Sequence, residues 1–168
     1  MSTRLPDSPA EKLKTWISDI RVAMFTTVAA NGALHTRPMA TQESSSIDEI
    51  WFFTSSHNLL TEEIDHIPQV GLSYSDPVRK RYVSISGSAR ILRDEAKARE
   101  RWTPGVGAWF PKGPADPELR LICVTAQKAE YWDATVQRMS PIFERAKAAL
   151  GGESHPPAGD HGTLDLKP

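Results

Sequence analysis

The segment from Leu34 to Asn58 (LHTRPMATQESSSIDEIWFFTSSHN) constrains the fold most, because it predicts two strands joined by a polar loop. The first strand, Leu34 to Gln42, contains Pro38. Proline cannot donate a ladder hydrogen bond, so we expect an edge strand or a bulge there. The second strand, Glu49 to Thr54, is mainly apolar and runs into Thr54, Ser55 and Ser56. Hydroxyl groups at a helix start can bind an anion together with free N–H groups. The segment therefore predicts either an anion site beside a strand edge or an ordinary edge strand followed by a capped helix.

Other strands are indicated on both sides of this segment. Asn31-Gly32 supplies the positive φ angles of a tight hairpin, so Val22 to Val28 should pair antiparallel with the first strand. Apolar and polar residues alternate most clearly in Arg81 to Arg93. Further strands are expected at Gln69 to Tyr74 and at Leu119 to Trp132. These patterns predict a mainly β protein of the α+β class, with peripheral helices.

Helix signals stand between and around the strands. Ser8 and Pro9 combine an N-cap residue with a proline at the first helical position, and an apolar stripe follows. Shorter helices are expected at Asn58 to Ile67, at Glu95 to Trp102 and, near the C-terminus, from Ser140 to Leu150. The proline- and glycine-rich stretch between residues 103 and 117 is predicted as a loop. We expect one domain over residues 1–152 and a polar tail over residues 153–168.

Composition and motifs exclude several classes of function. The net charge of −1 argues against nucleic acid or an anionic membrane as a partner. The single cysteine, Cys123, lies in an apolar run and is expected to be a buried residue in a cytoplasmic protein. Phosphate-binding GxxxxGK and dinucleotide-binding GxGxxG motifs are absent, and the five histidines lack metal-ligand spacing, so no metal is expected. If the protein has an enzymatic activity, a cofactor should supply the chemistry.

The ordered set of short motifs resembles one family, the FMN-binding split-barrel proteins, in the general stress protein 26 branch of the pyridoxamine 5′-phosphate oxidase-like proteins. Each motif alone is weak, but together they cover nearly the whole chain in the right order. The matching stretches are 23–27, GALHTRPM at 32–39, IWFFTS at 50–55, 68–74, 83–89, WFPKG at 109–113, 116–117, 129–133 and 162–166.

The resemblance implies a six-stranded antiparallel split β-barrel of the FMN-binding type that forms a homodimer with two flavins at the interface. It places Arg37, Pro38 and Met39 beside the flavin ring or phosphate, and Thr54 and Ser55 near the phosphate. Phe53 is a further cofactor-binding candidate. Trp109 and Trp132 are the candidates for aromatic contacts from the partner subunit, with core packing as the equal alternative. FMN is the implied cofactor, with FAD also open.

Two departures from the family pattern bear on function. Relatives usually carry basic residues early in the helix after the Thr-Ser turn, where this chain has Leu59 and Leu60. The C-terminal motif with which true pyridoxamine phosphate oxidases bind substrate is absent, so that activity is rejected. The resemblance then implies a flavin-dependent oxidoreductase acting on an unidentified small molecule. The alternatives are a flavin-binding or storage protein without turnover, and a barrel that has lost its flavin.

Overall fold

The computed structural model describes residues 8–133 and 160–166, in which one antiparallel sheet carries four helices. The strands are β1 (Val22–Val28), β2 (Leu34–Ala40), β3 (Glu49–Ser55), β4 (Gln69–Asp76), β5 (Arg81–Leu92), β6 (Leu119–Asp133) and β7 (Asp160–Asp165). The helices are α1 (Pro9–Ile20), α2 (Leu59–His66), α3 (Glu95–Glu100) and α4 (Pro104–Trp109). None of these helices is long and apolar enough to cross a membrane. The predicted C-terminal helix at 140–150 lies outside the described residues.

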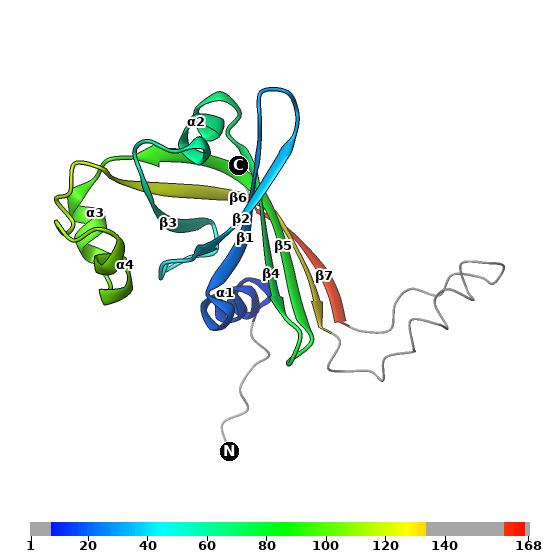
Figure 1. Cartoon of the computed structure of the whole chain (residues 1–168). Helices are drawn as coiled ribbons and strands as arrows, with labels where there is room; N and C mark the ends of the chain where they lie inside the picture. The colour runs from blue at the N-terminus through cyan, green and yellow to red at the C-terminus, as the bar shows by residue number, and fades with distance from the viewer. Residues whose placement is uncertain (1–7, 134–159, 167–168) are drawn as a thin grey trace, which may run out of the picture.

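The strands are ordered β2-β1-β4-β5-β6-β3, and β7 also pairs with β6 (Figure 1). In the part of the chain that the structure describes, one isolated bridge spans the two ends of the sheet, from Gln42, just after β2, to Trp51 of β3. The sheet therefore curls into a barrel that is left open between β2 and β3. This confirms the predicted split-barrel fold, with seven strands instead of the six that the resemblance implied.

Strand β6 is long enough to hold three neighbours. β5 pairs along one edge of β6, while β3 and β7 follow each other along the other edge. The β5–β6 register shifts between Ser86 and Gly87, which leaves Gln127 of β6 as the extra residue of a bulge. Beside the bulge, the edge of β6 opposite β5 changes its partner from the β3 side to the β7 side. Ala126 N donates to Asp48 O, just before β3, and Gln127 O accepts from Leu166 N, just after β7. β7 lies within the segment that the sequence predicted as a polar tail.

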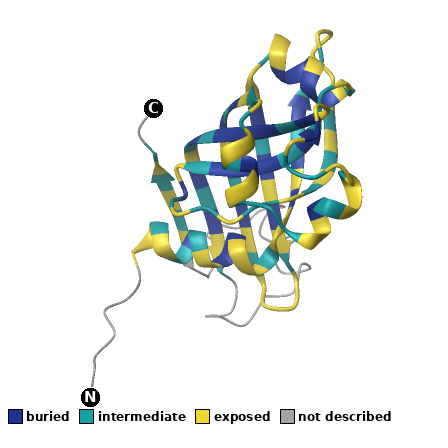
Figure 2. Ribbon diagram, turned by 90° about the vertical axis from the view of Figure 1, so that its left-hand side faces the viewer, coloured by how far each residue is buried: buried dark blue, intermediate teal, exposed yellow. Residues whose placement is uncertain are grey.

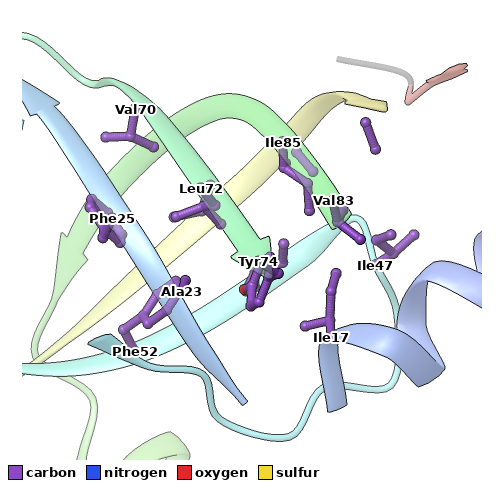
Figure 3. Packing of buried hydrophobic residues seen from close by; sticks show 14 of the residues in the cluster. Ile17, Ala23, Phe25, Ile47, Phe52, Val70, Leu72, Tyr74, Val83 and Ile85 are labelled. Atoms are coloured by element: carbon purple, nitrogen blue, oxygen red, sulfur yellow. The ribbon is translucent and has the colours of Figure 1, made fainter. Parts of the chain in front are cut away.

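The core fills the inside of the barrel, and the strands alternate between buried and exposed residues (Figure 2). Phe25 of β1 meets Phe52 of β3 edge-to-face at 5.1 Å between ring centroids (Figure 3). Helix α1 adds Leu13, Trp16 and Ile17 to the same cluster. A second cluster lies on the other face of β3 and β6, under α3 and α4, and contains Trp51, Ala98, Leu119, Leu121 and Cys123. Because both of its faces are covered, β3 is apolar throughout its middle.

The predicted edge position of Pro38 is confirmed by the hydrogen-bond register of β2. Ala29 N donates to Ala33 O and Thr41 N donates to Arg21 O, so the odd-numbered residues of β2 form the hydrogen-bonded pairs with β1. Pro38 pairs with Met24 at a non-hydrogen-bonded position. Its nitrogen therefore points towards the opening between β2 and β3, where a missing N–H interrupts no ladder.

Candidate functional site in the opening of the barrel

The predicted site residues of β2 and β3 lie on the two sides of the barrel's opening. If the antiparallel register of the Gln42–Trp51 bridge is continued, Met39 falls level with Thr54 and Pro38 with Ser55. The two strands make no ladder there, so backbone groups on the open edge of β2 are available to another molecule. Helix α2 follows directly after β3 and contacts side chains from both groups.

On the β3 side, Asn58 organises the hydroxyl residues. Asn58 caps α2 by accepting from Thr61 N at 2.9 Å, and Thr61 in turn accepts from Asn58 N, which completes a capping box. Asn58 Nδ2 also donates to Thr54 Oγ1 at 2.9 Å and to Ser55 Oγ at 3.1 Å. Each hydroxyl thus receives one hydrogen bond and keeps its own hydrogen for an acceptor. Two O–H donors are held side by side at the start of a helix.

On the β2 side, Arg37 points to a buried carboxylate on α2. Glu63 is 5 % exposed and accepts hydrogen bonds from Thr27 Oγ1, His35 Nδ1 and Arg37 Nη2, the last at 3.2 Å. The other terminal nitrogen of the guanidinium, Arg37 Nη1, is buried and has no hydrogen-bond partner in the described residues. A buried charged donor without a partner is costly, so this nitrogen is the atom that an anionic ligand would satisfy.

Burial raises the pKa of Glu63, but the hydrogen bonds from Thr27, His35 and Arg37 outweigh it and hold the pKa below the usual range. The carboxylate is therefore ionised at neutral pH and offsets part of the charge of Arg37. The sequence analysis missed this cluster. Its signal was the position of Glu63 on the apolar stripe of α2, between Leu60 and Ile64, where a charged residue is unusual.

The remaining predicted residues occupy different surroundings. Met39 packs against the core, and Phe53 meets Trp102 edge-to-face at 5.9 Å on the outer side of β3. Trp109, at the end of α4, is 82 % exposed. Trp132 is half-exposed and stacks on His161 of β7 at 5.2 Å. Within one chain, Arg37 contacts α2 through Glu63, and Thr54 and Ser55 contact its N-cap residue Asn58. Trp109 ends α4, and Trp132 stacks on β7.

Cys123 is fully buried on β6, as the sequence predicted. Burial raises the pKa of its thiol, so the reactive thiolate is disfavoured. No cluster of three or more His, Cys, Asp or Glu side chains is placed to hold a metal ion within residues 8–133 and 160–166.

Leu60 occupies the core and not the surface of the opening. It is 5 % exposed and packs in the main cluster with Ile64, whereas its neighbour Leu59 is 55 % exposed. We expect Leu60→Lys to lower the free energy of unfolding by about 3 kcal/mol, because it removes core packing and buries an unpaired charge. Leu59→Lys, the matched control one residue away, should change it by less than about 0.5 kcal/mol. Urea denaturation of the two variants checks this, and equal effects would contradict the placement of Leu60.

An antiparallel barrel open between two strands is the architecture of a split-barrel protein. Residues 8–156 match the family model described as "Pyridoxamine 5'-phosphate oxidase like", and the chain belongs to this family.

Individual relatives agree with this assignment. The chain is 32% identical to the general stress FMN/FAD binding protein from Xanthomonas citri, over 78% of this chain and 92% of that one, with a TM-score of 0.67. It is 26% identical to Protein bli-3 from Neurospora crassa, over 91% of this chain and 78% of that protein. A protein related to general stress protein 26 from Clostridium acetobutylicum shares the fold, with a TM-score of 0.70 over 93% of both chains and 17% sequence identity.

Proposed function

We propose that this protein binds a flavin phosphate, FMN in preference to FAD, in the opening between β2 and β3. The observation that carries the proposal is the buried Arg37 Nη1, which has no partner in the described residues and lies on the strand that borders the opening. The relative from Xanthomonas citri, whose name records FMN/FAD binding, supports the same assignment.

The residues present fit a phosphate group, which they would bind with moderate affinity. Arg37 supplies one cation, and the hydroxyls of Thr54 and Ser55 supply two donors fixed by Asn58. Position 60 of α2 carries an uncharged leucine that packs in the core, so α2 adds no cation there. The open edge of β2, from Thr36 to Ala40, offers backbone groups to the polar edge of a flat ring. Pro38 keeps this edge from pairing with another strand.

With FMN bound, the protein would act as an oxidoreductase on a small substrate, the flavin supplying hydride or electron transfer. The alternative is a flavin-binding protein without turnover, or a barrel that has lost the flavin. Two observations favour this alternative, namely the missing cation at Leu60 and the partial neutralisation of Arg37 by Glu63. The buried cysteine is compatible with the reducing cytoplasm, where we place the protein.

We further propose a homodimer, in which a second copy covers the outer face of the β2-β1-β4-β5 sheet. In the middle of this face, the outward-facing residues of the four paired strands are all uncharged. They are Val22, Met24, Thr26, Val28, Leu34, Thr36, Pro38, Ala40, Gly71, Ser73, Ser84 and Ser86. Depletion of charge is typical of interface cores. The exposed Trp109 and Trp132 would be contributed to the partner's opening. Sedimentation equilibrium at micromolar concentration tests the dimer, and a monomer would exclude a site shared between subunits.

The flavin site is tested by titrating the protein and an Arg37→Gln variant with FMN, followed by flavin fluorescence. Loss of one charge-assisted contact of about 1.5–3 kcal/mol should weaken binding about tenfold to a hundredfold. Arg90→Gln is the matched control, because Arg90 forms an exposed ion pair with Glu49 on the outer surface. Equal affinities for parent and Arg37→Gln would place the flavin elsewhere, and no binding by the parent would favour the lost-flavin alternative.

A further inference from the structure

A cleft lies on the other side of the Gln42–Trp51 bridge from the proposed flavin site. It is bounded by the C-terminal end of α1, the loop between β2 and β3, and the segment that joins α3 to α4. Its volume of about 680 Å³ is within the range of small-molecule sites. None of Arg37, Thr54, Ser55 and Glu63 lines it. The cleft is therefore separate from the proposed flavin site.

Positive charge exceeds negative charge in the lining of this cleft. Lys14, Arg21 and Arg101 contribute cations, against the carboxylates of Glu43 and Glu100. Glu100 is already paired with Arg101 Nη1 at 2.9 Å. Lys14 and Arg21 have no ion-pair partner among residues 8–133 and 160–166, and neither does Glu43, which leaves two cations against one carboxylate at the cleft.

Arg101 supplies the strongest single indication of a ligand. Its side chain is 14% exposed, and its guanidinium lies over the ring of Trp51 at 4.5 Å, which fixes its position. Arg101 Nε is nevertheless buried and without a hydrogen-bond acceptor in the described part of the chain. Such a donor is satisfied when an anion binds beside it.

Arg21 adds an independent observation. It ends α1 with φ 66°, a left-handed conformation that glycine adopts more easily than arginine. Its carbonyl accepts from Thr41 N at 2.7 Å, which ties the end of α1 to the loop at the rim of the cleft. A charged side chain is thus held at the cleft in a backbone conformation that disfavours it. Unfavourable conformations of this kind tend to occur at functional positions.

We propose that this cleft binds a small organic anion, whose carboxylate or phosphate group is held by Lys14, Arg21 and Arg101. The apolar part of the molecule would rest on Ile17 and Ile50, which also line the cleft. The proposal goes beyond flavin binding and does not require it.

The experiment is isothermal titration calorimetry of the full chain with phenyl phosphate, benzoate and inorganic phosphate. Phenyl phosphate or benzoate should bind at one site per chain, and their relative affinities tell a phosphate head from a carboxylate head. Arg21→Gly and Lys14→Ala should each weaken binding at least tenfold. For Arg21→Gly the melting temperature should stay the same or rise, because the left-handed position is relieved, so weaker binding cannot be attributed to unfolding.

Two controls locate the site. Arg99→Ala removes the same charge from α3 at an exposed position paired with Glu95, outside the lining, and should leave binding unchanged. Arg37→Gln should also leave it unchanged. The proposal is overturned if neither organic anion binds at millimolar concentration, if Arg99→Ala weakens binding as much as Arg21→Gly, or if Arg37→Gln abolishes it. The last result would assign the anion to the proposed flavin-phosphate site.

Discussion

Gly87→Ala is expected to lower the free energy of unfolding by about 3 kcal/mol, at the upper end of the usual range for overpacking. A Cβ at Gly87 would lie 2.3 Å from the carbonyl oxygen of Thr125, a backbone atom of β6. Backbone held between β5 and β3 cannot move away as the end of a side chain could. The bulge at Gln127 would have to open instead. Thermal and urea denaturation measure the loss.

The matched control is Gly71→Ala on the adjacent strand β4. A Cβ at Gly71 would meet only the Thr26 Cβ, at an ordinary contact distance of 3.8 Å, and the φ angle of Gly71 is not positive. Gly71→Ala should therefore be neutral or stabilising by up to about 0.5 kcal/mol, since alanine restricts the unfolded chain. If both variants lose the same stability, the tight β5–β6 contact is not the cause.

Glu63→Ala is expected to destabilise the fold by about 3–5 kcal/mol and to weaken FMN binding in the same variant. The substitution leaves the partly buried Arg37 without its carboxylate, and it removes one acceptor of Thr27 and the side-chain partner of His35. Arg37 would then lose the contact that fixes its orientation beside the opening, and we expect this loss to outweigh the removal of the neutralising carboxylate. Urea denaturation and FMN titration measure the two effects.

Glu62→Ala is the control, because Glu62 neighbours Glu63 on α2 and is exposed. Its effect should stay below about 0.5 kcal/mol. Comparable losses for the two variants would mean that helix propensity or general charge, and not the buried cluster, sets the stability of α2.

The same cluster predicts a pH dependence. The pKa of Glu63 is depressed in the folded protein, so its contribution to stability is fully present above the pKa of an unfolded glutamate, about 4.3. The contribution is lost as the pH falls from that value through the lower folded pKa. The stability difference between the parent and Glu63→Gln should consequently be constant near neutral pH and shrink below about pH 4.3.

Local sequence determined most of the secondary structure. Asn31-Gly32 fixed the β1–β2 hairpin, where Gly32 has φ 83°, and Ser8-Pro9 fixed the start of α1. The position of Pro38 on an open edge followed from chemistry within one strand, because proline lacks a donor in any context. These features depend on residues only a few positions apart, so the local sequence is enough to predict them. Helix α4 had a local signal as well, Thr103 as N-cap before Pro104, within the stretch predicted as a loop.

Tertiary structure alone decided which elements meet when they are distant in the sequence. β7 is a short polar strand whose only strand partner in the described residues is the second half of β6, and no pattern in its own residues selects that edge. The pairing of Glu63 with His35 and Arg37 joins residues that are 28 and 26 positions apart. The curvature of the barrel likewise decides two other features. It buries Leu60, and it places Lys14, Arg21 and Arg101 around one cleft. Contacts between distant residues form only where closing the sheet brings their side chains together, and a local pattern does not encode that geometry.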